Sequence, residues 1–131
     1  MKEKLKIIPL GGLNEIGKNM TVIEYGGYIV VIDCGVAFPD DDMLGVDLVI
    51  PDTTYLKRNI NKLRGYVITH GHEDHICAIP YVLRECNAPI YATRLTCGII
   101  ETKLSEHRMP QKVKLNHVRA GDTIRLGCFK I

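Results

Sequence analysis

The chain contains no tryptophan and only two phenylalanines among its 131 residues. A surface that stacks successive bases of single-stranded nucleic acid needs exposed aromatic rings, so composition alone does not indicate such a surface. A large excess of charge of one sign is also missing, because the chain has 17 lysines and arginines and 15 aspartates and glutamates, which gives a net charge of +2. That balance is too mild to indicate a nucleic-acid partner, so any such partner has to be argued from a site.

Long apolar runs and secretion signals are missing as well. The longest apolar runs have the length of a strand, such as residues 28–32, far short of the roughly 20 residues that cross a membrane. The opening MKEKLKIIPL lacks the apolar core and the cleavage site of a signal peptide. The five cysteines are scattered and form no C-x-x-C pair, which is typical of free thiols in a reducing compartment. We therefore expect a cytoplasmic protein without a membrane partner.

The order of the predicted elements indicates a layered α/β protein. Two β-branched runs joined at Gly26 and Gly27 predict a tight hairpin, and later strands alternate with helices. That order is typical of a sheet with helices packed against it. The predicted strands are residues 4–10, 19–26, 28–35, 65–69, 89–93, 112–118, 122–127 and 128–131. The predicted helices are residues 55–63, 79–86 and 94–108.

The densest chemistry lies in YVITHGHEDHICAIPYVL, where His70, His72, Asp74 and His75 form an H-x-H-x-D-H pattern after a predicted buried strand. Neutral imidazoles and a carboxylate are ligands that zinc prefers, with manganese or iron as alternatives. Neighbouring pairs can serve two adjacent ions, His70 with His72 and Asp74 with His75. A polar loop with incidental histidines is the other interpretation. Because three of the five histidines fall within six residues, we favour a metal site.

Three further motifs accompany the histidine cluster THGHEDH: PLGGLNEIGKNM, VIDCGVAFPDDDMLGVDLVIPD and IPYVLR. With H-x-H-x-D-H after a strand, they make the chain resemble the ribonuclease J family, in the β-CASP branch of the metallo-β-lactamase superfamily. The resemblance covers essentially all 131 residues. It implies an α/β protein with the αββα metallo-β-lactamase fold, in which a mixed, largely antiparallel sheet has flanking helices. Residues 1–131 would be the N-terminal part of that domain, truncated, with the β-CASP and C-terminal domains absent.

The resemblance also implies a chemistry. The family hydrolyses RNA phosphodiester bonds, internally and from the 5′ end, with a hydroxide held between two metal ions. Two zinc ions per complete site are expected, with manganese as an alternative, and RNA is the expected partner. Asp74 would act through the metal-bound water as one of the four ligands His70, His72, Asp74 and His75. Asp33 matches an aspartate that orients a metal ligand without contacting the ion.

The family's remaining ligands are expected after Ile131. His107 and His117 are isolated from other ligands, so we do not expect them to bind metal. The 131 residues alone should therefore be a poor enzyme or none. Two alternatives stay open: another hydrolase with the same fold, of thioesterase or lactonase type, or a truncated metal-binding chain that catalyses nothing.

The loop GLNEIGKN, residues 12–19, fits G-x-x-x-x-G-K but ends in Asn19 where a nucleotide-binding loop needs serine or threonine. It also leads into a strand, so we reject nucleotide binding. The resemblance places this loop at the border of the active site, where Asn14 and Lys18 can contact substrate. A turn with exposed polar residues is an equally good interpretation.

The sequence stops inside a strand pattern, because GCFKI is followed by no turn signal or polar tail. If that strand lacks its neighbours, an open sheet edge should seek a partner. We therefore expect the chain to form a homo-oligomer, a dimer by edge pairing or strand exchange. Light scattering at high protein concentration should report the mass of two chains. A strictly monomeric species under those conditions would contradict this expectation.

Overall fold

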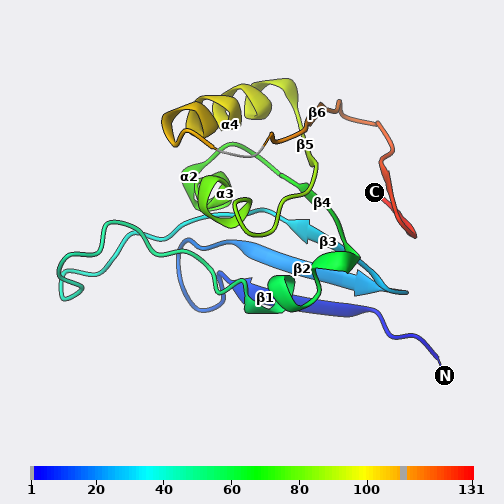
Figure 1. Ribbon diagram of the computed structural model, residues 1–131, viewed down its shortest axis with the longest axis horizontal. Coiled ribbons are helices and arrows are strands. Elements are labelled where there is room, and N and C mark those ends of the chain that lie inside the picture. Colours follow the sequence, from blue (N-terminus) through cyan, green and yellow to red (C-terminus); the bar gives the residue numbers. More distant parts are fainter. Residues whose placement is uncertain (1, 110–111) are drawn as a thin grey trace.

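The computed structural model describes residues 2–109 and 112–131, in which six strands form one mixed sheet with the order β1-β2-β3-β4-β5-β6 (Figure 1). The strands of this sheet are β1 (Lys6–Gly11), β2 (Met20–Tyr25), β3 (Tyr28–Ile32), β4 (Leu63–Val67), β5 (Ile90–Ala92) and β6 (Leu115–His117). A separate hairpin consists of β7 (Arg125–Leu126) and β8 (Phe129–Lys130). Every predicted strand thus overlaps an observed one, although β1 and β4 extend beyond the predicted ranges.

Four α-helices and one 3₁₀ turn connect the strands. They are α1 (Thr54–Arg58), η1 (Ile60–Lys62), α2 (Glu73–Ile76), α3 (Ile79–Val82) and α4 (Arg94–Glu106). The predicted helix 94–108 is confirmed as α4. The predicted helix 55–63 divides into α1 and η1, because the Asn59 side chain donates to the carbonyl of Tyr55 at 2.8 Å and ends α1 there. Among the described helices, none combines the length and apolar character that crossing a membrane requires.

The sheet is mixed as predicted, but the expectation of a largely antiparallel sheet is wrong for the described strands. The pairs β1-β2 and β2-β3 are antiparallel, whereas β3-β4, β4-β5 and β5-β6 are parallel. The predicted turn between β2 and β3 is confirmed, since Gly26 and Gly27 have φ angles of 60° and 79° that suit a two-residue hairpin. Each later connection includes a helix and returns the chain to the same end of the sheet, which makes the following pair parallel.

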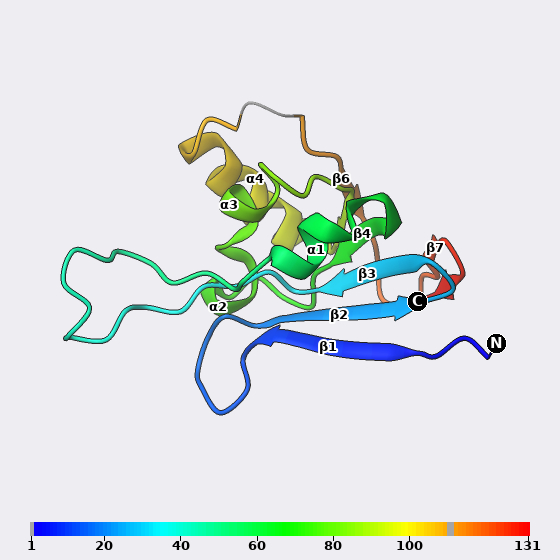
Figure 2. The same cartoon turned by 60° about the horizontal axis from the view of Figure 1, so that its bottom comes forward.

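All four helices contribute buried side chains to one core on a single face of the sheet. Leu56 of α1, Ile76 of α2, Ile79 of α3 and Ile100 of α4 pack in the same cluster as Tyr66 of β4. Figure 2 shows these helices over the strands from a second direction. Each fully buried side chain of this kind contributes about 1.5–3 kcal/mol to the free energy of unfolding. This one-sided core fixes the strand ends from which the candidate site emerges.

The hairpin of β7 and β8 packs against the sheet without joining it. A Cβ atom built on Gly65 of β4 would lie 3.2 Å from Cδ1 of Leu126, so β7 passes close to the middle of β4. The edges of the main sheet among the described strands are therefore β1 and β6. The expected edge pairing between two chains remains a prediction, and β1 and β6 are the edges that it would use.

A buried carboxylate ties α1 and η1 to the sheet. Glu24 of β2 is only 6 % exposed, and it accepts hydrogen bonds from the Tyr55 hydroxyl and from Nζ of Lys62 at 3.3 Å. Nζ of Lys6 lies 4.0 Å from the same carboxylate. Burial is the largest influence and opposes ionisation, but the hydrogen bonds from Tyr55 and Lys62 outweigh it. The pKa of Glu24 therefore lies below its ordinary value, and the pKa of Tyr55 is raised chiefly by the same bond.

Glu24→Gln should destabilise the chain at neutral pH, by about 1–3 kcal/mol, because it removes a buried charged acceptor. The lowered pKa means that the unfolded chain binds more protons than the folded chain at acidic pH, so this stabilisation is lost as the pH falls through the folded pKa. Urea unfolding at pH 7 and at pH 3 should show a larger difference between the two proteins at pH 7. The exposed Glu101→Gln is the control, and an equal difference at both pH values would contradict the assignment.

Candidate metal centre

The predicted metal ligands and Asp33 lie at the edge of the sheet where β3 and β4 end. Because these two strands are parallel, the segments that follow them leave the sheet side by side. The backbone N–H of Asp33, just after β3, donates to the carbonyl of Val67 at 3.0 Å. The N–H of Thr69 donates to Oδ1 of Asp33 at 2.8 Å. His70, which follows Thr69, therefore begins the histidine cluster from a fixed backbone position.

Asp33 is the buried centre of this arrangement. It is 6 % exposed, and its Oδ2 accepts hydrogen bonds from the Thr69 hydroxyl at 2.8 Å and from Nδ1 of His75 at 2.7 Å. Asp33 also has a φ of 63°, a left-handed conformation that costs free energy for a residue other than glycine. The hydrogen bonds offset that cost. Since a carboxylate only accepts, Nδ1 of His75 carries the proton. Nε2 therefore has a lone pair with which it can coordinate a metal ion.

The short helix α2, which was not predicted, holds the second half of the motif against β3. The N–H of Cys34 donates to the carbonyl of His75 at 2.8 Å, and the N–H of Asn19 donates to the carbonyl of Asp74 at 3.2 Å. A Cβ atom built on Gly35 would lie 1.6 Å from the carbonyl oxygen of Asp74. Only glycine permits this approach, so Gly35 is required for α2 to lie where it does.

The four predicted ligands gather in one place, although they do not surround a common point. The ring centroids of His70 and His72 are 4.6 Å apart, and those of His70 and His75 are 4.0 Å apart. Oδ2 of Asp74 lies 3.5 Å from Nε2 of His75. Over residues 2–109 and 112–131, no group of three or more histidine, cysteine, aspartate or glutamate side chains is arranged to hold a metal ion. The ligand assignment therefore stays a prediction.

The donor chemistry of the cluster nevertheless fits a divalent ion. Three imidazoles and one carboxylate are a ligand set typical of zinc, and Asp33 supports one imidazole as buried carboxylates do in metal centres. The thiols nearby are poorer candidates, because Cys34 is fully buried and burial raises the pKa of both Cys34 and Cys77. The neighbouring side chains thus leave the histidines and Asp74 as the ligands with the right chemistry.

Asn19 is a site residue that the sequence analysis missed. Its Nδ2 donates to Oδ2 of Asp74 at 3.1 Å and lies 3.4 Å from Nε2 of His75. The amide therefore contacts the same two atoms that would ligate an ion. The sequence contains no local signal for this role, because Asn19 and Asp74 are 55 positions apart. Thr69 was missed too, although its place directly before His70 at the end of a strand could have indicated it.

The two predicted substrate contacts lie in the loop before β2, away from these hydrogen bonds. Asn14 is exposed and has a φ of 54°, and Lys18 has a φ of 51°. Nζ of Lys18 lies 3.3 Å from Oε2 of Glu15, so its charge is already paired. A role for Asn14 or Lys18 in substrate binding stays a prediction.

The other two histidines lie outside the cluster. Nδ1 of His107 is 2.9 Å from the carbonyl of Lys103, and its Nε2 is 3.1 Å from the Tyr81 hydroxyl, so both ring nitrogens have protein partners. His117 is exposed on β6. The expectation that neither side chain is a ligand stays a prediction.

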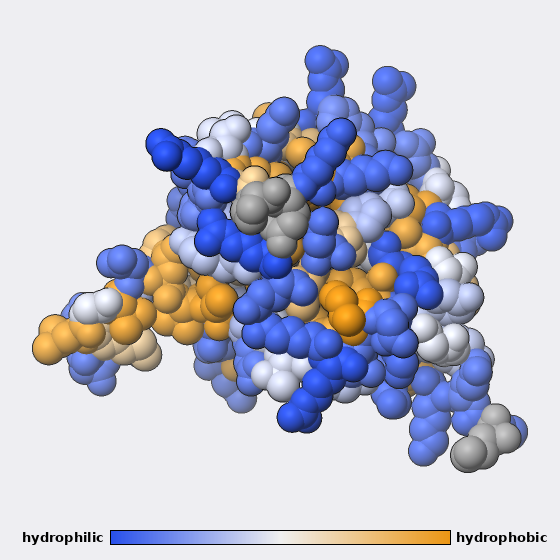
Figure 3. All heavy atoms as spheres, viewed as in Figure 1, coloured by the Kyte–Doolittle hydropathy of each residue, from blue (hydrophilic) through white to orange (hydrophobic). Residues whose placement is uncertain are grey.

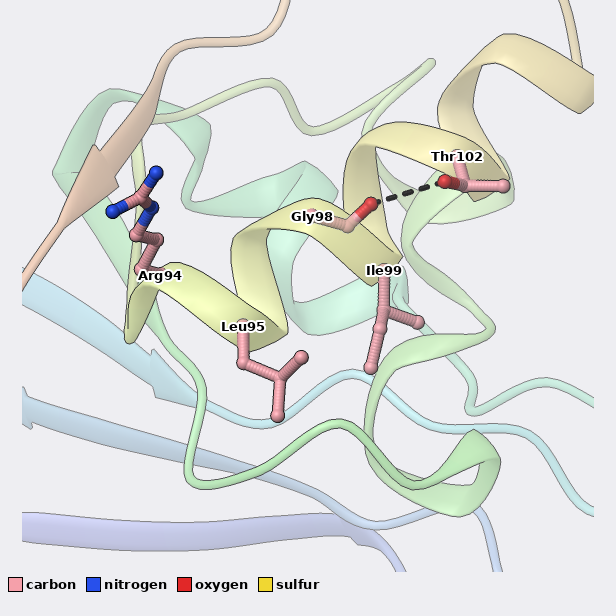
Figure 4. Close-up of a pocket in the computed structure, with 5 residues that line it drawn as sticks. All are labelled: Arg94, Leu95, Gly98, Ile99 and Thr102. Carbon is pink, nitrogen blue, oxygen red and sulfur yellow. Dashed lines mark hydrogen bonds between the residues drawn. The ribbon is translucent and has the colours of Figure 1, made fainter.

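A hollow of about 440 Å³ opens directly onto the cluster. Its lining residues are Ile16, Gly17, Val36, Ala37, Phe38, Gly71, His72, Glu73 and Asp74. Another hollow, of about 610 Å³, runs along α4 and is lined by Arg94, Leu95, Gly98, Ile99 and Thr102 (Figure 4). Its lining includes no histidine or carboxylate, so of these two hollows the first is the one that combines space for a substrate with candidate ligands.

Asp33→Asn should weaken metal binding by about 10- to 100-fold, because an amide cannot hold the proton on Nδ1 of His75 as a carboxylate does. Asparagine tolerates a left-handed backbone, so the fold should be kept. Metal content per chain, measured by elemental mass spectrometry after dialysis against zinc or manganese, tests this. The double variant His70→Ala/His72→Ala should lose the metal, and the exposed Asp47→Asn should keep it. Absence of metal from the unaltered chain would contradict the ligand assignment.

Comparison with known proteins places this geometry in a family. The sequence profile of the metallo-beta-lactamase superfamily matches residues 13–125. The chain is 49 % identical over 126 residues to ribonuclease J of Synechocystis sp., which covers 95 % of this chain and 20 % of that protein. It is 46 % identical over 114 residues to ribonuclease J 1 of Streptococcus pyogenes, covering 85 % of this chain and 20 % of the relative. The chain thus spans about a fifth of the length of the curated relatives that it matches.

Solved structures agree on the fold. A diphosphatase from the PhnP family superposes with a TM-score of 0.65 at 21 % identity, covering 97 % of this chain and 55 % of that one. The metallo-beta-lactamase fold protein YhfI from Bacillus subtilis superposes with a TM-score of 0.59 at 17 % identity, covering 98 % of this chain and 52 % of that one. At these identities the likeness concerns the fold alone. The sequence profile and the shared fold together establish that the chain belongs to the metallo-β-lactamase superfamily.

Proposed function

We propose that the chain is the N-terminal part of the metallo-β-lactamase domain of a ribonuclease J, a metal-dependent enzyme that hydrolyses RNA internally and from its 5′ end. The identity of 41–49 % to ribonucleases J over most of the chain supports this proposal. The observation that carries it is the hydrogen bond from His75 to the buried Asp33, because it orients an imidazole of the H-x-H-x-D-H motif as a metal ligand.

The residues of the chain would divide the work as follows. Divalent ions, zinc or manganese, would be held by His70, His72, Asp74 and His75 and would supply Lewis-acid stabilisation of charge that develops on a phosphate. Asp33 keeps the proton on Nδ1 of His75 and fixes the orientation of the ring. The backbone and hydroxyl of Thr69 hold the Asp33 carboxylate in turn. The hollow beside His72 and Asp74 would receive the RNA strand.

The proposal places the remaining ligands outside these 131 residues, together with the β-CASP and C-terminal domains. A motif that supplies its ligands from six consecutive residues approaches an ion from one side, and a two-ion centre needs more. We therefore propose that residues 1–131 alone are inactive. The five described cysteines are all free thiols, which supports the cytoplasm as the proposed compartment.

One observation favours a second candidate, a metal-binding chain without catalysis. Within the described residues, no three potential ligands converge on one point, and the amide of Asn19 contacts Asp74 and approaches His75. A chain of this kind would bind a single ion weakly and leave RNA intact. It differs from the first candidate in what happens once the missing segments are supplied.

A chimera tests the ribonuclease proposal. Residues 1–131 would replace the matching segment of the Synechocystis ribonuclease J, to which they are 49 % identical. The chimera should cleave a 5′-labelled RNA, and His70→Ala/His72→Ala in the chimera should reduce the rate by at least about 10³-fold, since metal ligands are lost. His117→Ala, an exposed histidine of β6, should leave the rate unchanged. Thermal unfolding would show whether the chimera is folded. A folded chimera that binds metal and cleaves no RNA would overturn the proposal.

A further inference from the structure

Phe38 is an exposed aromatic residue that follows a backbone position held by two hydrogen bonds. It is one of only two phenylalanines in the chain, and its side chain is 66 % exposed. The preceding residue, Ala37, exchanges two backbone hydrogen bonds with Val49, of 2.8 and 2.9 Å. This bridge closes the base of a loop that projects from the body of the molecule between β3 and α1 (Figures 1 and 2). The bridge thus holds the backbone next to Phe38 while the ring itself stays exposed.

The ring of Phe38 stands between the candidate metal centre and a lysine of α4. On one side it lines the 440 Å³ hollow together with His72 and Asp74. On the other side it lines a smaller hollow of about 110 Å³ that includes Lys103. Ile16, which is 94 % exposed, lines the first hollow as a second apolar side chain. Phe38 is therefore shared by the hollow of the candidate ligands and the hollow of Lys103, and a ligand that occupies both contacts it.

We propose that Phe38 forms a base-stacking subsite, in which one nucleobase of single-stranded RNA lies on the ring beside the phosphate bound at the metal centre. The proposal rests on the proposed ribonuclease function and adds a binding residue to it. Ile16 would form an apolar wall of the same subsite. Nζ of Lys103 lies 3.9 Å from Oε2 of Glu106, a weak surface ion pair, and would attract the next phosphate from there. A phenyl ring suits this role because every base has a face that can stack on it, whatever the sequence.

Charge around the ring favours a base over the other apolar partners. Glu73 lines both hollows, and three consecutive aspartates, Asp40 to Asp42, follow in the projecting loop. Negative charge at this rim repels a phosphate or an anionic lipid headgroup from the ring itself, so an uncharged planar group is the better partner there. Figure 3 shows further hydrophobic residues in the projecting loop. Its exposed apolar side chains include Met43, Leu44 and Val46, none of which lines the 440 Å³ hollow.

The absence of tryptophan makes this subsite measurable. Phe38→Trp would be the only tryptophan of the chain, and a base stacked on it should quench its fluorescence. Titration with a single-stranded RNA hexamer, in a chelator and again with zinc, should give saturable quenching in at least one condition. Leu44→Trp, in the same loop and 92 % exposed, should show no saturable quenching. An abasic strand with the same phosphates should bind without quenching.

Equal quenching of the two tryptophan variants, or equal quenching by the abasic strand, would overturn the subsite. Phe38→Ala gives an independent measurement, because it should weaken binding of a labelled RNA about tenfold in fluorescence anisotropy. In the chimera, Phe38→Ala should raise KM with little change in kcat. Phe38→Tyr, which keeps an aromatic ring, should leave KM at the value of the unaltered chimera. Saturable quenching together with an inactive chimera would keep the subsite and reject the ribonuclease function, so the two failures are distinguishable.

Discussion

The hydrogen bond between the buried carboxylate of Asp33 and Nδ1 of His75 joins the parts of the molecule on which the site depends. Asp33 follows β3, Thr69 follows β4, and His75 lies in α2, so one carboxylate connects two parallel strands and a helix. A buried carboxylate is costly unless its lone pairs are occupied, and three donors occupy them here. These hydrogen bonds offset the cost of burying the charge, and the one from His75 also fixes the orientation of its imidazole.

Backbone packing makes that hydrogen bond attainable. The chain after β3 must pass close to α2, and Gly35 permits this because any side chain would overlap the carbonyl oxygen of Asp74. Backbone hydrogen bonds then hold Cys34 in place: its N–H donates to the carbonyl of His75 at 2.8 Å, and its carbonyl accepts from the N–H of Ala78 at 3.0 Å. The motif is therefore held by main-chain contacts that would be the same for many side chains. Its chemistry comes from the few residues whose side chains point away from this contact.

The sequence predicted what is local and missed what depends on distant segments. Strands with β-branched runs and the amphipathic α4 were predicted because their signals lie within a few residues. The prediction underestimated the share of parallel pairs, which are β3-β4, β4-β5 and β5-β6, because strand direction depends on how each helix returns the chain. Asp33 was identified through its resemblance to a family motif, whereas Asn19 carried no such signal. Composition suggested no base-stacking surface, and only the fold placed Phe38 beside the candidate ligands.

The one-sidedness of the cluster follows from how it is built. His70, His72, Asp74 and His75 all lie within six consecutive residues after β4, so as ligands they would approach an ion from the protein side only. The opposite side is the hollow of about 440 Å³ that His72 and Asp74 line. A metal centre open on that side can take both further ligands and a substrate phosphate, whereas a closed set of four protein ligands is typical of structural zinc.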